Sequence, residues 1–299
     1  MAPVRRSEPP SAARPTREER YRWGKRLRQK VPRSSHAIWT PARDRPDPLD
    51  LLARSDRRRV GGLLPIRYGR MSINPFAFLR GAADVMAADL ATTPTTGLRV
   101  QLGGDAHLSN FGIFGTPERH EVFDLNDFDE TLPGPWEWDV KRLATSFVAG
   151  GRAHALAPVD CHRAALRAAR SYRESMNSYA FERYLDIWYS HLDPEQVSRQ
   201  VRRGARRVIG RLARRARGRT VLHVFPKVVR KVGGGYRIRD VPPLIVHYPG
   251  RWRQEITHVL VQRYLATIPE DRRMLLERYR IADVAQKLSL IHISEPTRP

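Results

Sequence analysis

The amino-acid sequence predicts an α+β fold in which helices dominate and short strands form hairpins. Two short apolar runs, residues 111–114 and 120–123, flank a polar turn and predict a β-hairpin. At 299 residues and 41% hydrophobic content, the chain can bury a substantial core. Apolar residues at helical spacing predict helices over residues 76–90, 139–155, 159–189, 194–217 and 253–266.

The remaining elements are short. Residues 98–102 are predicted to form a strand that leads into the loop at Gly104. Two further strands, 221–225 and 236–238, are predicted to pair through residues 233–235, a Gly-Gly-Gly run. This run is more typical of a hairpin turn than of a phosphate cradle, because no helix start follows it. The single cysteine, Cys161, excludes an internal disulfide and is predicted to be a small buried residue.

An acidic segment stands out in a strongly basic chain. The protein has 54 Lys+Arg and 31 Asp+Glu, a formal net charge of +23, yet residues 101–139 hold nine acidic residues and one basic residue, Arg119. Asp and Asn side chains in short Gly-containing loops are hard oxygen ligands suited to Mg²⁺. The segment therefore predicts a divalent-cation site, for which the phosphates of a nucleotide are the natural third partner.

The order of the motifs in this segment is informative. Gly104-Asp105-Ala106-His107-Leu108-Ser109-Asn110 precedes the predicted hairpin, and Asp127-Phe128-Asp129-Glu130 follows it. Asp139, twelve residues after Asp127, precedes a helix start. This arrangement resembles the catalytic core of aminoglycoside- and choline-kinase-like phosphotransferases. Together with residues 65–71, 76–81 and 242–245, it also resembles a bacterial family of unknown function, number 2252, over residues 21–287.

The resemblance implies the helical lobe of a protein-kinase-like fold with a catalytic-loop β-hairpin. Its catalytic and metal loops would lie within residues 103–139. The implied activity is transfer of the γ-phosphate of ATP to an unknown hydroxyl acceptor, a small molecule or a protein, with Mg²⁺ or Mn²⁺ as the metal. Asp105 would accept the proton of the attacking hydroxyl or orient it. His107 is expected to brace the loop by hydrogen bonding more than to perform acid–base chemistry.

The resemblance also implies the metal ligands. Asn110 and Asp127 would hold the cation against the nucleotide phosphates, with Asp129 as a second acidic ligand. Asp124 is the alternative primary ligand, since it directly follows a predicted strand, but the twelve-residue interval favours Asp127. A solvated acidic surface, with Asp139 as a helix N-cap, is the plainer interpretation. An EF-hand loop is excluded by Phe128, and a metallophosphoesterase would need further His ligands in a matching context.

A second charged feature lies further along the chain. Residues 199–219 contain ten Arg and no acid, although 48 of the 54 basic residues are Arg, which also indicates a coding bias. Five of them are predicted to share one helical face: Arg199, Arg202, Arg203, Arg206 and Arg207. The alternative function is therefore a non-catalytic module that binds a polyanion or nucleic acid. A solvated face in an Arg-biased protein is the plainer interpretation.

The domain organisation has three predicted parts. Residues 1–20 form a flexible basic arm, residues 21–287 a partial kinase-like domain, and residues 288–299 a non-native tail that resembles a translated sequencing adapter. No Gly-rich loop or strand Lys of the kinase type is evident, so we expect the nucleotide-binding lobe to be missing and the fragment to be inactive. No long apolar run or secretory signal is present, and the cytoplasm is the expected location.

Overall fold

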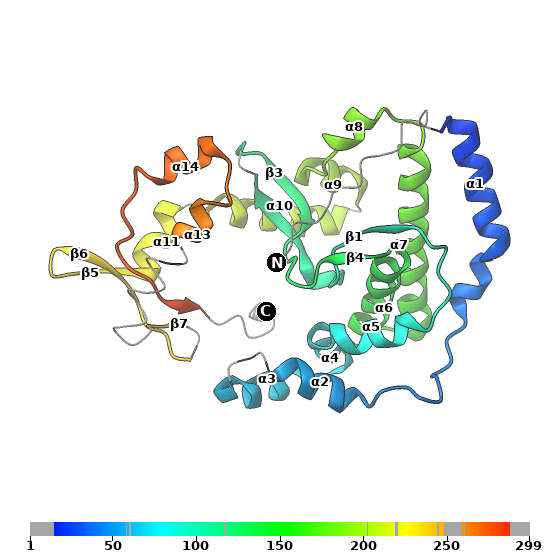
Figure 1. The fold of residues 1–299 in the computed structure, drawn as a ribbon, viewed down its shortest axis with the longest axis horizontal. Coiled ribbons are helices and arrows are strands. Elements are labelled where there is room, and N and C mark those ends of the chain that lie inside the picture. Colours follow the sequence, from blue (N-terminus) through cyan, green and yellow to red (C-terminus); the bar gives the residue numbers. More distant parts are fainter. Residues whose placement is uncertain are drawn as a thin grey trace.

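The computed structural model describes residues 15–287, apart from residues 58, 60, 117, 202, 219–220, 244, 248–258 and 260. Helices dominate, and the named strands pair as two-stranded antiparallel sheets, which agrees with the predicted α+β class (Figure 1). The helices before the first sheet are α1 (Arg17–Lys30), α2 (Pro48–Asp56), α3 (Leu64–Met71), α4 (Pro75–Gly81) and α5 (Ala83–Ala91). None of the helices in the described ranges is long and apolar enough to cross a membrane.

The middle of the chain alternates strands and helices. Its strands are β1 (Arg99–Leu102), β2 (Phe111–Gly115), β3 (Glu121–Leu125) and β4 (Leu132–Pro135), and its helices are α6 (Glu137–Ala153), α7 (Pro158–Tyr179), α8 (Tyr184–Trp188), α9 (Pro194–Gln200) and α10 (Arg203–Gly218). The C-terminal part contains α11 (Val221–Val228), β5 (Val229–Val232), β6 (Gly235–Ile238), β7 (Ile245–Val246), α13 (Val261–Leu265), α14 (Glu270–Leu276) and β8 (Gln286–Lys287).

Helices α6 and α7 form the centre of the helical body. They approach closely at Gly151, where an added Cβ would lie 2.5 Å from the Sγ of Cys161. Cys161 is 2% exposed, which confirms the prediction of a small buried residue. Just before α6, the ring of Trp136 stacks on Tyr172 of α7 with centroids 5.6 Å apart. The pair thus gives α6 a fixed position from which to support the preceding loops.

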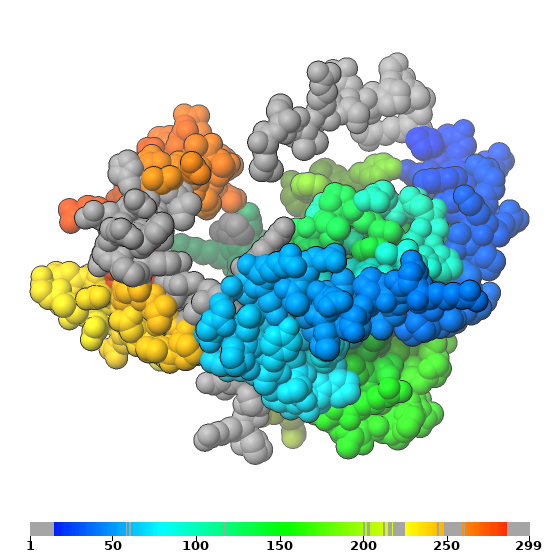
Figure 2. Space-filling view, turned by 60° about the horizontal axis from the view of Figure 1, so that its bottom comes forward, coloured from blue at the N-terminus to red at the C-terminus, as the bar shows by residue number. Residues whose placement is uncertain are grey.

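Helices α2 to α5 pack together against this body and are drawn in blue to cyan in Figure 2. Their buried apolar cluster consists of Leu52, Met71, Ala82 and Val85. Arg67 is also buried there, and its guanidinium donates to the Asp56 carboxylate at 3.1 Å and to the Gly81 carbonyl at 2.6 Å. The two acceptors offset part of the cost of burying this cation, and burial still lowers the pKa of Arg67.

The predicted hairpin is confirmed. Strands β2 and β3 pair from Phe111 opposite Leu125 to Gly115 opposite Glu121. The hairpin therefore returns the chain so that Asn110 and Asn126 lie side by side, and the Asn126 N–H donates to the Asn110 carbonyl at 2.8 Å. The predicted strand at 98–102 is present as β1, and its partner is β4 on the far side of the acidic loop.

Three predicted helices are each divided in two. The 76–90 helix breaks at Ala82, where φ is −125° and ψ is 45°. The 159–189 helix ends at Tyr179 before α8, and the 194–217 helix breaks at the extended Val201, with φ −102° and ψ 159°. Apolar spacing continues across such breaks, so periodicity alone does not show them. Arg199 consequently lies on α9, whereas the arginines after the break lie on α10. The prediction that these arginines share one helical face is therefore wrong. Arg202 lies outside the described residues.

The predicted strand 221–225 is also wrong, because these residues begin helix α11. The turn residues Gly233 and Gly234 have φ of 55° and 80°, a conformation typical of a two-residue hairpin turn. Such a turn pairs the residues directly beside it, so β6 pairs with β5 rather than with the earlier apolar run. Short apolar runs do not distinguish a strand from a helix. Half of the predicted 253–266 helix lies outside the described residues, and the described half includes α13.

The ends of the described region bear on the predicted domain limits. Helix α1 begins at Arg17 with a capping box between Thr16 and Glu19, so the last residues of the predicted arm are helical. Residues 1–14 of that arm and the predicted tail, 288–299, lie outside the described residues.

Near the C-terminal limit, His247 lies between two carboxylates, 2.7 Å from Asp240 and 2.8 Å from Asp283. The hydrogen bond with Asp283 is the main reason why the pKa of His247 is raised.

Candidate functional site

The loop between β1 and β2 rests on the start of helix α6. The N–H groups of Gly103 and Gly104 donate to the two carboxylate oxygens of Asp139, at 2.8 and 3.1 Å. Asp139 is the third residue of α6 rather than its N-cap, so the plainer interpretation of this residue is wrong. Gly104 has a φ of +81°, and an added Cβ would lie 2.0 Å from the Glu130 carbonyl oxygen. The loop therefore packs directly against the acidic loop that follows β3.

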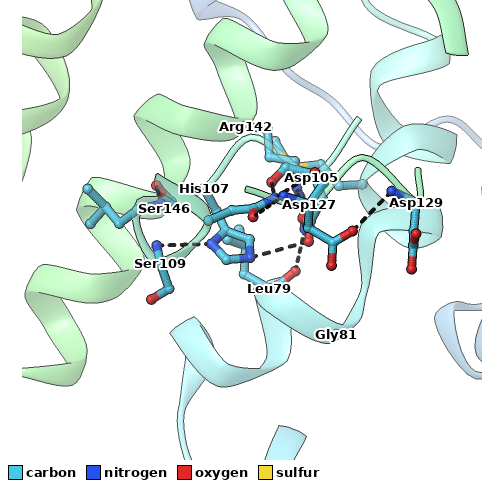
Figure 3. Close-up of polar contacts among 12 residues, drawn as sticks. Leu79, Gly81, Asp105, His107, Ser109, Asp127, Asp129, Arg142 and Ser146 are labelled. Carbon is cyan, nitrogen blue, oxygen red and sulfur yellow. Dashed lines mark hydrogen bonds and ion pairs between the residues drawn. The ribbon is translucent and has the colours of Figure 1, made fainter. Parts of the chain in front are cut away.

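Asp105 is buried at 3% exposure and forms an ion pair with Arg142 of α6. Its Oδ1 accepts from Nε of Arg142 at 2.7 Å and also from a terminal nitrogen of the same guanidinium (Figure 3). Arg142 further donates to the carbonyl of Leu79 at 2.8 Å. Burial alone would raise the pKa of Asp105, but the contacts with His107 and Arg142 outweigh it and hold the pKa below its usual range. Asp105 is thus an ionised carboxylate enclosed by its partners.

His107 is fully buried and braces the same loop. Its Nδ1 accepts the backbone N–H of Ser109 at 3.1 Å, and its Nε2 lies 3.2 Å from Oδ2 of Asp105 (Figure 3). Because Nδ1 is an acceptor, the ring proton of the neutral imidazole is on Nε2 and faces the carboxylate. This geometry supports the bracing role that the sequence favours for His107.

Asn110 joins the two loops. Its side chain is 2% exposed, and its Nδ2 donates to the carbonyls of Asp105 at 3.0 Å and of Asp127 at 3.2 Å. Its Oδ1 accepts the N–H of Asp127 at 3.0 Å. Every polar atom of this amide therefore connects the Asp105 loop to the Asp127 loop. One lone pair of Oδ1 remains for a further partner.

The predicted metal ligands separate into two groups. Asp127 is held by Asn110, and its Oδ1 accepts the N–H of Asp129 at 3.1 Å, which fixes the turn that presents both carboxylates. Asp124 instead lies within β3 opposite Gly112, and its exposed carboxylate accepts the N–H of Leu125 at 2.7 Å. The two alternatives for the primary ligand are Asp127 and Asp124. The Asn110 contacts bring Asp127, and not Asp124, to the Asp105 loop.

Glu130 is a site residue that sequence reasoning did not single out. Burial and the charges of Asp105, Asp127 and Asp129 together raise its pKa. Its carboxyl therefore lies in the negative field of three other carboxylates, of which Asp105 has a cationic partner, Arg142. The signal available in the sequence was its position at the end of the Asp-Phe-Asp-Glu run, but that run alone does not tell which carboxylates converge.

Replacing Glu130 by glutamine should stabilise the protein at pH 7. A carboxyl whose pKa is raised by folding adds stability below its unfolded pKa and loses that contribution as pH rises through the folded value. The neutral amide avoids this loss, and we expect a rise in melting temperature of about 1–4 °C at pH 7 that shrinks toward pH 4. Thermal melts followed by circular dichroism measure it. An equal rise in the exposed Glu182→Gln variant would contradict the explanation.

The donor set suits a hard cation that keeps water and phosphate ligands. Among the described residues, no three His, Cys, Asp or Glu side chains are arranged as a complete metal-binding group. Mg²⁺ usually takes only one or two protein carboxylates and completes its shell with phosphate oxygens and water. Asp127 and Asp129, with the remaining lone pair of the Asn110 amide, fit that requirement, and the raised pKa of Glu130 marks the negative field that a cation would offset.

Comparison with known proteins places this site inside a recognised family. A family described as an uncharacterised protein conserved in bacteria (DUF2252) matches residues 59–290. The matched region includes both loops, the hairpin between them and helix α6. Searches of the curated proteins and of the solved structures gave no match.

Proposed function

The chain belongs to the bacterial DUF2252 family, and we propose that its site serves phosphoryl transfer from ATP to a hydroxyl acceptor, assisted by Mg²⁺ or Mn²⁺. One observation carries this proposal: the buried Asn110 amide binds the Asp105 loop to the Asp127 loop with three hydrogen bonds. Acidic loops joined in this way are what a phosphate-bound cation requires. Phosphoryl transfer relies on such positioning and on charge neutralisation more than on covalent chemistry.

The roles of the chain's own residues follow from their contacts. Asp127 and Asp129 would hold the cation, with the Asn110 amide oxygen beside them. Bound there, the cation would neutralise charge on the transferred phosphoryl group. Asp105, enclosed by Arg142 and His107, acts in this proposal as a positioning residue that fixes the turn from which Asn110 reaches across. A direct role in accepting the hydroxyl proton would need its carboxylate to become exposed.

Titration of Mg²⁺ or Mn²⁺ by calorimetry tests the cation site in this chain. We expect binding to the wild type and a loss of at least about tenfold in affinity in an Asp127→Ala, Asp129→Ala double variant, because two carboxylate ligands are removed. Asp124→Ala is the matched control, since this exposed aspartate lies within β3 opposite Gly112 and should leave the affinity unchanged. Equal binding by the wild type and the double variant would remove the cation site.

The transfer step is tested in a family member that also carries a Gly-rich loop and a strand Lys. Its ATP turnover should require the residues that match Asp127 and Asn110. If such a protein binds the cation but never turns over ATP with a broad set of hydroxyl acceptors, the phosphotransferase proposal fails while the cation site stands.

A further inference from the structure

Helix α10 carries an arginine face that the candidate site does not use. A shallow hollow on this helix is lined by Arg206, Arg207, Gly210, Arg211 and Arg214. These positions recur at spacings of one, four, five and eight residues, so they lie on one side of a helix. On another side, Ala213 is buried and Ile209 half-buried, and α10 packs on α9 and β2. We call the hollow and its four arginines the α10 arginine face.

Some of the arginines of α10 form hydrogen bonds or ion pairs within the protein. Arg206 donates to the carbonyls of Val201 at 3.1 Å and Arg199 at 3.3 Å, and so joins α10 to the end of α9. At the end of the helix, Arg217 pairs with Glu121 of β3 at 2.9 Å. The other three arginines of the α10 arginine face form no ion pair with the residues that the structure describes: Arg207, Arg211 and Arg214.

We propose that the α10 arginine face binds the phosphodiester backbone of double-helical nucleic acid. Residues 207 and 214 are about 10 Å apart along the helix axis, at a rise of about 1.5 Å per residue. That length is more than a single phosphoryl group would occupy and suits a row of phosphates, which rise by about 3.4 Å each along the duplex axis. Gly210 has no side chain, which leaves the hollow between the guanidinium groups open to a phosphate.

The composition of the helix favours a duplex and a contact without base recognition. Residues 203–218 contain no aromatic side chain, whereas proteins that bind single strands stack bases on aromatic rings. Arginine can contact guanine edges as well as phosphates, but the helix has no Asn, Gln or acidic residue to read the other bases, so we assign it to the backbone. The net charge of +23 adds long-range attraction. Compared with the Arg face predicted from the sequence, the α10 arginine face keeps Arg206 and Arg207 and adds Arg211 and Arg214. It does not include Arg199, Arg202 or Arg203.

Fluorescence anisotropy with a labelled 20-base-pair duplex of mixed sequence tests the proposal, between about 50 and 200 mM salt. The variant carries Arg→Gln changes at positions 207, 211 and 214. Each phosphate contact contributes about 0.9 to the slope of log affinity against log salt. We therefore expect the slope to flatten by up to about 2.7 and the affinity to fall at least about tenfold at the low-salt end.

Two control variants distinguish binding by the α10 arginine face from attraction by the net charge of the protein. The same three Arg→Gln changes on the exposed side of α7, at positions 167, 170 and 173, remove equal charge and should leave most of the binding. Arg→Lys changes at 207, 211 and 214 keep the charge and should retain the salt slope. Equal loss in the α7 and α10 variants would overturn the proposal, as would tight binding of a phosphoserine-rich peptide without binding of the duplex.

The surface is independent of the candidate site. The Asp127→Ala, Asp129→Ala double variant should bind the duplex as the wild type does, because its changes lie outside α10. Loss of duplex binding in that variant would assign the contact to the acidic loops or to the whole fold, and would overturn the assignment to the α10 arginine face.

Discussion

Replacing Arg142 by methionine should lower the free energy of unfolding by about 3–5 kcal/mol, a drop in melting temperature of about 10 °C. Arg142 and Asp105 are both 3% exposed, so the change leaves the Asp105 carboxylate buried without its ion-pair partner, although His107 still lies 3.2 Å away. It also removes the donor to the Leu79 carbonyl, which ties α4 to α6. Chemical denaturation followed by circular dichroism measures the loss.

A double-mutant cycle separates the ion pair from a general packing defect. Asp105→Asn should also destabilise the protein, because the Arg142 cation is then buried without its counter-ion. The double variant should lose less than the sum of the two single losses, with a coupling energy of about 1–3 kcal/mol. If the losses in unfolding free energy are strictly additive, Arg142 acts through packing alone and the ion pair does not stabilise the Asp105 loop.

Replacing Gly104 by alanine should disrupt both loops of the candidate site. A Cβ would lie 2.0 Å from the backbone oxygen of Glu130, and the φ of +81° is one that alanine rarely adopts. Backbone cannot yield as a flexible side chain can, so the two loops must move apart. We expect a loss of at least about 2 kcal/mol in stability, and of Mg²⁺ or Mn²⁺ binding as well. Denaturation curves and calorimetric titration measure the two effects.

Gly97→Ala is the matched control for this experiment. Gly97 has a φ of +82°, nearly the same as that of Gly104, but nothing lies within 4 Å of its added Cβ. The control thus reports the backbone strain alone, about 1 kcal/mol, and should leave cation binding unchanged. If both variants lose the same stability and keep cation binding, close approach of the two loops is not what requires glycine at position 104.

Local features of the structure follow from the sequence by itself. The β2–β3 hairpin, strand β1 and the Gly233-Gly234 turn depend on neighbours within a few residues, and their patterns predict them directly. The proximity of the two acidic motifs can also be predicted from the sequence, because a short hairpin between them must return Asp127 to Asn110. The burial of Cys161 is likewise expected for a lone, small cysteine, and it is confirmed.

Contacts between distant segments were decided only by the tertiary structure. Asp105 and Arg142 are 37 residues apart, and nothing in the chain marks which of 48 Arg would neutralise that carboxylate. The convergence of Glu130 with three other carboxylates likewise depends on how the loops fold against each other. Helix breaks at Ala82 and Val201 arise where packing overrides an apolar period that continues through them. Periodic patterns in a sequence indicate local geometry. Ion pairs between distant residues and the packing of one loop against another depend on long-range contacts, which leave no periodic pattern in a single sequence.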